Sequence, residues 1–321
     1  MMQLPDLQQK QILFIDSRAH EGVTGIRFEN DNLVFEKDGK VVNRASCHRV
    51  LAVFILGDLT LTTALIRKGA ECGVIFFFMN NNFKVYGAVG AYSDGNFLLR
   101  SQQYKVSEEV NLKIAKHLIK NKISNQARLL QKRGNNDGET ENVLKQIDKA
   151  ENDAELRGIE GNYASKFFKE YFAETNWVRR EPRTKGDIQN LLLDIGYTTL
   201  FNFIDALLRL YGFDVYKGVY HKLFFARKSL VTDIQEPFRC IVDKALLKAY
   251  NLKQVNKKDF YVKDGAYVLP WQHSQKYYRL FSEAIMERKE EIYLFVQAFY
   301  RHMMHQENEL QYFDITKKYK K

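Results

Sequence analysis

Hydrophobic and polar positions change their spacing near residue 96 of the chain. Before it, short β-branched and aromatic runs are separated by turn residues such as Asp38-Gly39 and Asn80–Asn82, which predicts strands. One short helix is expected at Thr60–Lys68, with Gly69 as its stop. The expected strands are residues 12–15, 23–28, 33–36, 50–56, 74–79 and 84–88.

Beyond residue 96, apolar residues recur at helical spacing, as in Val110, Ile114 and Leu118, which stand amid lysines. A polar loop is expected at 133–138. Gly212 is expected to end the helix predicted over 187–211. The pattern predicts an α+β fold in which a β-rich domain, 1–95, precedes a larger all-helical domain, 96–321. The expected helices are residues 102–124, 140–174, 187–211, 234–251 and 274–308.

Composition narrows the class of protein. The chain has 321 residues, 45% of them hydrophobic, which is enough for a core and argues against disorder. The net charge of +10 suggests a polyanionic partner such as nucleic acid. Cys47, Cys72 and Cys240 are far apart and form no C-x-x-C pair, so neither a zinc ribbon nor a redox motif is indicated. With sparse cysteines, no secretory pattern and no long apolar run, we expect a soluble, cytoplasmic protein without a membrane partner.

Glu160 is the first candidate for chemistry. It lies beside an apolar stripe that steps by four residues, and it is flanked by Gly158 and Gly161. Glycines beside a carboxylate allow another backbone or a ligand to come close. The alternative is a surface glutamate on a helix that the two glycines weaken.

His221 and the pair Asp233 and Glu236 are the other candidates. His221 stands in an apolar and aromatic stretch, where a lone histidine can also be a satisfied, partly buried residue. Asp233 and Glu236 are three apart where a helical pattern begins, so they also fit a D-x-x-E capping box. Pro237 fits the first turn of that helix.

Taken together, two carboxylates and an imidazole suit Mg²⁺ or Mn²⁺ bound to substrate phosphate, where the ion can act as a Lewis acid on a phosphodiester. Cationic residues near this set are expected to contact DNA phosphates, and the alternative for each is a solvated surface charge. A metal pair of His302 and His305 is not favoured, because no carboxylate or cysteine partner is evident for them. The cationic residues are Arg157, Arg179, Arg180, Arg183, Lys185, Lys222, Arg227, Lys228 and Arg239.

Three segments in series, 158–172, 186–221 and 229–243, resemble the CRISPR-associated integrase of the spacer-acquisition module, with weaker similarity over the β-rich start and 96–104. The resemblance implies that Glu160, His221 and Glu236 are catalytic and bind one divalent metal, Mg²⁺ or Mn²⁺. Asp233 matches a further acidic position near that site. Arg239 would orient Glu236 or contact phosphate.

The resemblance also implies an activity and an assembly. The activity is insertion of short foreign DNA into a CRISPR array by 3′-hydroxyl transesterification, with endonuclease activity when water attacks instead. The β-rich domain would form a homodimer, and two dimers would flank a small ferredoxin-like partner in a heterohexamer-type complex on double-stranded DNA. Two alternatives stay open: a metal-dependent repair or recombination nuclease that never integrates, and a non-catalytic basic DNA-binding scaffold.

Overall fold

The structure is a computed structural model. It describes residues 10–17, 23–79, 85–90, 96–135, 138–175, 177–222, 224–305 and 310–317. The turn expected at Asn80–Asn82 lies outside the described residues, as do Lys84 and the side chain of His305. The chain divides into two compact units, one of Met1–Phe97 with Asp205–Phe213 and the other of Leu98–Ile204 with Asp214–Lys321.

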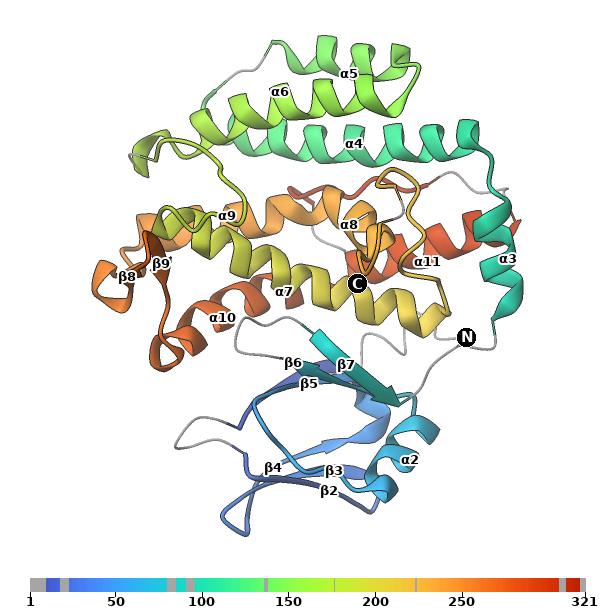
Figure 1. Cartoon of the computed structure of the whole chain (residues 1–321), viewed down its shortest axis with the longest axis vertical. Helices are drawn as coiled ribbons and strands as arrows, with labels where there is room; N and C mark the ends of the chain where they lie inside the picture. Colours follow the sequence, from blue (N-terminus) through green and yellow to red (C-terminus); the bar gives the residue numbers. More distant parts are fainter. Residues whose placement is uncertain are drawn as a thin grey trace. The chain divides into compact units, whose positions relative to one another are not determined.

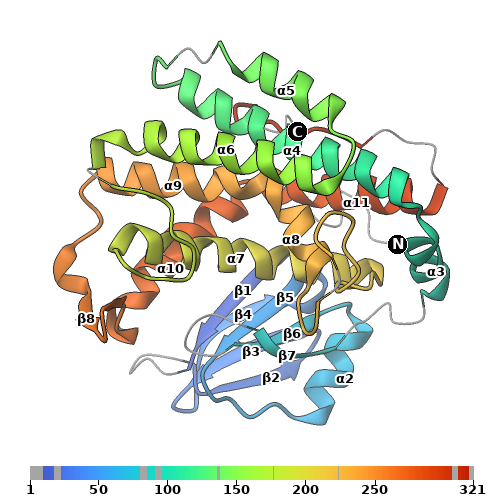
Figure 2. The same cartoon turned by 45° about the horizontal axis from the view of Figure 1, so that its top comes forward.

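The described part of the first unit contains two sheets, α2 and the C-terminal end of the long helix α7 (Ile188–Tyr211) (Figures 1 and 2). A four-stranded sheet has the order β1-β5-β6-β7, in which only β7 runs antiparallel to its neighbour, and a three-stranded antiparallel sheet has the order β2-β3-β4. The elements are β1 (Gln11–Asp16), β2 (Gly25–Glu29), β3 (Asn32–Lys37), β4 (Lys40–Ser46), η1 (Cys47–Arg49), β5 (Val50–Leu56), α2 (Thr63–Glu71), β6 (Ile75–Met79) and β7 (Val85–Gly90).

The core of this unit forms where both sheets and α2 turn their apolar residues toward one another. Ile15 of β1, Leu33 of β3 and Leu65 of α2 are among its buried members. β5 is buried along its whole length because it is an inner strand paired on both sides. Strands of this kind in parallel sheets have continuous apolar runs in their sequence. The run Val50–Leu56 therefore allowed this strand to be predicted with its observed bounds.

Two features of this unit differ from the prediction. β4 was not expected, because it is an edge strand whose first five residues are exposed and carry no apolar alternation. Gly69 does not stop the helix but lies inside α2, where an added Cβ would meet the Phe76 ring at 2.6 Å. The glycine serves close packing of α2 on β6, and the helix continues to Glu71.

The second unit is helical apart from one short hairpin (Figure 1). This confirms the predicted order of a β-rich part followed by a helical part. The helices are α3 (Phe97–Lys105), α4 (Glu108–Gln131), α5 (Thr140–Lys149), α6 (Asp153–Tyr171), η2 (Ala173–Thr175), α7 (Ile188–Tyr211), α8 (Ser229–Gln235), η3 (Glu236–Phe238), α9 (Arg239–Asn251), η4 (Lys257–Asp259), α10 (Trp271–Met286) and α11 (Lys289–His305), and the hairpin is β8 (Tyr261–Lys263) with β9 (Ala266–Val268).

Some of the predicted helix boundaries differ from the observed ones and others agree with them. The helix expected over 140–174 is broken before Asn152, whose side chain accepts hydrogen bonds from the backbone of Ala154 and Glu155 as an N-cap. The helix expected over 274–308 is likewise two helices, α10 and α11. Gly212 follows α7 with φ +85°, as predicted for a helix end.

α7 is long and apolar enough to cross a membrane by length and composition alone. Its apolar window is 78% buried within the structure, as is usual for the core helix of a globular protein.

α4 organises the helical unit. It packs against α5 and α6 and also against α8, η3 and α9 (Figures 1 and 2). Two buried asparagines, Asn121 and Asn125, bind the backbone of Phe313 and Ile315 in the C-terminal segment, with distances of 2.7–3.0 Å. This segment, Leu310–Lys317, is therefore held by its own chain along α4.

Candidate active site

Three elements of the helical unit bring the predicted site residues together. Glu160 lies in α6, His221 follows α7 in a loop, and Glu236 begins η3 directly after α8. α4 packs against both α6 and η3, so it stands between the two glutamates. The stripe predicted on α6 is buried at Tyr163, Phe167 and Tyr171, and this packing fixes the face from which Glu160 projects.

Lys122 of α4 links the two glutamates. Its ammonium nitrogen lies 2.5 Å from Glu160 Oε1 and 2.6 Å from Glu236 Oε2. Burial alone would lower the pKa of Lys122, but the charges of Glu160 and Glu236 outweigh burial and raise it. The lysine is therefore a buried cation held between two carboxylates.

Glu236 is the most deeply placed of the three residues, with 4% of its surface exposed. Burial opposes its ionisation, but Lys122 and Arg239 outweigh burial and lower its pKa to about 2, with a smaller contribution from His221. His221 is thus close enough to Glu236 to act on its charge. Arg239 Nη1 is 3.5 Å from Glu236 Oε1.

Asp233 positions His221. Its carboxylate accepts backbone hydrogen bonds from Val219 (2.7 Å), Tyr220 (3.0 Å) and His221 (3.1 Å), and its Oδ1 lies 2.5 Å from His221 Nδ1. An ionised Asp233 has no proton to give, so the imidazole donates from Nδ1, and in the neutral ring Nε2 keeps the lone pair that can bind a metal. The interpretation of Asp233 and Glu236 as a capping box is wrong, because Lys228 is the N-cap of α8 and Asp233 lies inside the helix.

Tyr220 and Lys122 are parts of the site that sequence reasoning missed. The Tyr220 hydroxyl donates to Glu160 Oε2 at 2.7 Å, and burial with the nearby Glu160 charge raises the pKa of Tyr220. Lys122 was identifiable in principle, because it continues the spacing of Val110, Ile114 and Leu118 on α4. A lysine at the next position of an apolar stripe points into the molecule and needs an acidic partner.

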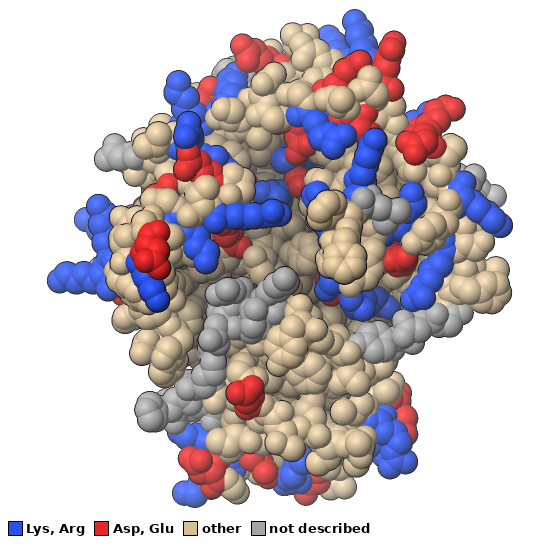
Figure 3. All heavy atoms as spheres, in the orientation of Figure 1, with Lys and Arg blue, Asp and Glu red and all other residues tan. Residues whose placement is uncertain are grey.

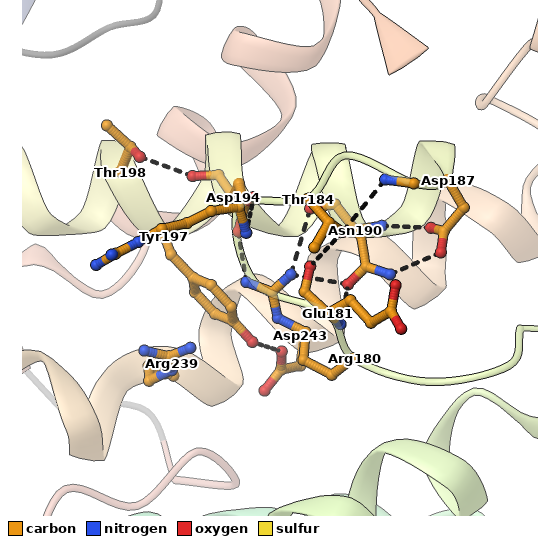
Figure 4. Close-up of polar contacts among 12 residues, drawn as sticks. Arg180, Glu181, Thr184, Asp187, Asn190, Asp194, Tyr197, Thr198, Arg239 and Asp243 are labelled. Atoms are coloured by element: carbon orange, nitrogen blue, oxygen red, sulfur yellow. Dashed lines mark hydrogen bonds and ion pairs between the residues drawn. The ribbon is translucent and has the colours of Figure 1, made fainter. Parts of the chain in front are cut away.

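A second polar cluster contains Tyr197, Asp243 and Arg239 (Figure 4). The guanidinium of Arg239 lies 3.9 Å from the centre of the Tyr197 ring, and the Tyr197 hydroxyl donates to the buried Asp243. Burial raises the pKa of Asp243 to about 6. Because Arg239 touches both Tyr197 and Glu236, this cluster fixes the cation that faces Glu236.

Arg180 belongs to the same cluster. It bonds Asn190 Oδ1 at 2.8 Å and Asp194 Oδ1 at 2.5 Å, and only 10% of its side chain is exposed (Figure 4). This position favours a structural role for Arg180 over the predicted contact with DNA phosphate. The side chain of Arg239 is 23% exposed and faces Glu236. Of the two roles that the resemblance implies, orienting Glu236 or contacting phosphate, this position favours the first.

The remaining predicted cations lie nearer the surface. Arg157, Arg179, Arg183, Lys222 and Arg227 are exposed, and Lys185 and Lys228 are half-buried. Figure 3 shows Lys and Arg side chains spread over the helical unit among Asp and Glu. Exposed cations of this kind can meet phosphates at little desolvation cost.

The donors fit a hard divalent cation. Glu236 Oε2 is buried and accepts no hydrogen bond of suitable angle, although the Lys122 ammonium is in ionic contact with it. A carboxylate oxygen of this kind, a second carboxylate on Glu160 and the Nε2 of His221 are ligand types that Mg²⁺ and Mn²⁺ accept. No added Cβ at Gly158 or Gly161 would touch another residue, so there is open space beside Glu160.

This chain is similar in sequence or in fold to several known proteins. A family profile described as CRISPR associated protein Cas1 matches residues 20–283. A relative named CRISPR-associated endonuclease Cas1 1, from Thermodesulfovibrio yellowstonii, is 28% identical over 297 residues, covering 86% of this chain and 92% of that protein. A casposase bound to an integration product has the same fold, with a TM-score of 0.77, 21% identity and coverage of 94% and 93% of the two chains. A partial Cas6-RT-Cas1–Cas2 complex contains a similar chain, with a TM-score of 0.69, 24% identity and coverage of 96% and 100%. Since the profile match spans most of its length, this chain belongs to the Cas1 family of CRISPR-associated proteins.

Proposed function

We propose that the chain is a divalent-metal-dependent DNA integrase that inserts short DNA fragments into a CRISPR array, with DNA endonuclease activity as the hydrolytic form of the same reaction. The observation that carries the proposal is the gathering of Glu160, His221 and Glu236 in one polar cluster of a Cas1-family chain. The casposase with this fold was solved with an integration product, and the relative from Thermodesulfovibrio yellowstonii is named an endonuclease.

The chain's own residues account for most of the proposed chemistry. Glu160, His221 and Glu236 would hold Mg²⁺ or Mn²⁺, which when bound polarises the phosphodiester and favours ionisation of the attacking hydroxyl. Asp233 fixes the His221 ring through Nδ1, which would leave Nε2 for the ion, and Lys122 and Arg239 keep Glu236 ionised. Exposed cations such as Arg157 and Lys222 would bind phosphates on either side of the reacting bond.

The assembly is proposed on the same family grounds. The similar chain in the Cas6-RT-Cas1–Cas2 complex was solved together with Cas2. We propose that residues 1–95 form the homodimer contact, and that two dimers flank a small ferredoxin-like partner in a heterohexamer-type complex on double-stranded DNA. Such a complex would act in the cytoplasm, where the array is.

A strand-transfer assay tests the function. The purified chain, with and without the small partner, is given Mg²⁺ or Mn²⁺, a short duplex with free 3′-hydroxyls and a supercoiled plasmid that carries a repeat array. Covalent joining of the duplex to the plasmid supports the integrase. Nicking without joining supports the repair or recombination nuclease, and DNA binding with neither activity supports the non-catalytic scaffold.

Gly218→Ala is expected to lower the joining rate by about 10- to 100-fold, because it displaces Asp233, the residue that orients the metal ligand His221. An added Cβ would lie 2.6 Å from Asp233 Oδ2 and 2.7 Å from the carbonyl oxygen of His221. The loop must therefore shift, and it carries His221 with it. The measurement is the joining rate beside the melting temperature. Gly138→Ala is the control, since its Cβ would meet open space away from the site; equal rates in the two variants would contradict the positioning role.

Phe224 and Phe225 offer a contact to DNA bases beside the site. They follow His221 in the loop before α8 and are 74% and 94% exposed, with Lys222 and Arg227 on either side. Aromatic rings among cations bind unpaired bases by stacking, worth about 1–3 kcal/mol per base. We propose that this loop holds the unpaired bases of a DNA end near the metal.

The double substitution Phe224→Ser and Phe225→Ser is expected to weaken binding of a duplex with single-stranded 3′ overhangs by roughly 10-fold or more, given that stacking energy. Affinity for a blunt duplex should change little. Fluorescence anisotropy with both DNAs measures this. Val178→Ser, which removes an apolar side chain that is 84% exposed, is the control. An equal loss on both DNAs would point to a general loss of binding instead.

A further inference from the structure

Cys47, His48 and Cys72 come together in the first unit, although 25 or so positions of sequence separate the two cysteines. One ligand atom from each residue lies within 4.8 Å of the other two. Cys47 is fully buried, Cys72 is half-buried and His48 is exposed. The sequence showed no C-x-x-C pair, and only the fold brings these side chains to one place.

Regular elements hold all three residues. Cys47 and His48 start η1, between β4 and β5, and Cys72 caps the C-terminal end of α2. The carbonyl groups at a helix C-terminus carry partial negative charge and favour a nearby cation. The backbone N–H of Cys47 donates to the carbonyl of Asp31 at 2.9 Å, in the turn between β2 and β3. Asp31 therefore lies next to Cys47.

We propose that Cys47, His48 and Cys72 bind Zn²⁺ as a structural site that joins the start of β5 to the end of α2. Two sulfurs and an imidazole form a soft-to-borderline donor set, which favours Zn²⁺ over the Mg²⁺ or Mn²⁺ expected at the carboxylates of the helical unit. The Asp31 carboxylate or a water would complete a tetrahedron. The cysteines are free thiols, and on binding their protons leave as the two S–Zn bonds form.

Other roles of the pair fit less well. A redox-active thiol is exposed, whereas Cys47 is fully buried. Two cysteines without a chemical role need no imidazole beside them. The site is independent of the proposed DNA chemistry, because its residues belong to the first unit and those of the DNA site to the second.

The test uses the full chain purified in a reducing buffer, with Co²⁺ as a spectroscopic substitute for Zn²⁺. We expect one equivalent of zinc per chain, and on Co²⁺ substitution a thiolate-to-cobalt charge-transfer band. Cys47→Ser and Cys72→Ser should each lose the band. Cys240→Ala, which removes a buried thiol from α9, should keep it, and so should His221→Ala. His48→Ala should shift the cobalt spectrum without unfolding, because His48 is exposed.

Three outcomes would overturn the proposal. Wild-type protein without a thiolate–cobalt band excludes the site even if a cysteine variant fails to fold. Equal zinc content in wild type and in a folded Cys72→Ser protein assigns the metal elsewhere. A disulfide between Cys47 and Cys72 in the freshly purified protein would identify the pair as a covalent cross-link. Loss of strand transfer in all proteins would count against the proposed function and leave this inference untouched.

Discussion

His221→Ala is expected to abolish DNA joining and cleavage while the protein stays folded and still binds DNA. The substitution removes the one nitrogen ligand of the proposed metal site, and losses of about 10³-fold or more follow from removing such electrostatic support. The fold should tolerate it because the buried Asp233 keeps three backbone N–H donors. Only about 1–3 kcal/mol of charge-assisted hydrogen bonding is lost.

Three measurements separate the interpretations of that variant: the joining rate, the affinity for duplex DNA and the melting temperature. Asp233→Asn is the matched comparison, because it keeps the ring nitrogen but weakens the group that orients it. An intermediate rate is expected for this variant. A His221→Ala protein that joins DNA at the wild-type rate would remove His221 from the metal site and leave the proposed mechanism without its nitrogen ligand.

The sequence was sufficient wherever residue type and spacing carried the signal alone. The apolar run of β5 and the helix end at Gly212 are as expected because each depends on local chemistry. The order of a β-rich part before a helical part follows from the change in apolar spacing near residue 96. The edge strand β4 was missed because an exposed strand has no buried face to impose alternation.

The site could be predicted only in part, for a physical reason. Glu160, His221 and Glu236 were recognisable as metal-ligand types, but Lys122 and Tyr220 enter the site through packing of α4 and the loop after α7. Arg180 was grouped with the DNA contacts because net charge does not tell a solvated guanidinium from one paired inside the fold. Cys47 and Cys72 meet only when the end of α2 comes beside η1 in the folded unit, a contact that has no signature in local sequence.

Lys122→Met is expected to produce the largest change in stability, and the change should depend on metal. The ammonium forms ion pairs with both Glu160 and Glu236, and removing one partner of a buried ionic group costs about 3–5 kcal/mol. Methionine keeps the apolar stem in place. Without divalent metal, the melting temperature should therefore fall by roughly 10 °C, which is the shift that such a loss of unfolding free energy produces in a unit of this size.

Added Mg²⁺ or Mn²⁺ should restore much of that loss, because the ion then faces two carboxylates without a competing ammonium. The gain in melting temperature on adding metal should accordingly be larger in Lys122→Met than in wild type. Lys113→Met is the control on the same helix, since that lysine is 70% exposed and pairs with Glu109 at the surface.

The pH dependence gives an independent check of the same pair. The pKa of Glu236 is lowered to about 2 from an ordinary value of 4.5, so the stability it contributes is present above pH 4.5 and is lost as the pH falls toward 2. Without Lys122 that pKa should rise, and metal-free Lys122→Met should lose less stability on acidification than wild type does. Equal metal-induced gains and equal acid sensitivity in the two proteins would mean that Lys122 and the metal do not share the carboxylates of Glu160 and Glu236.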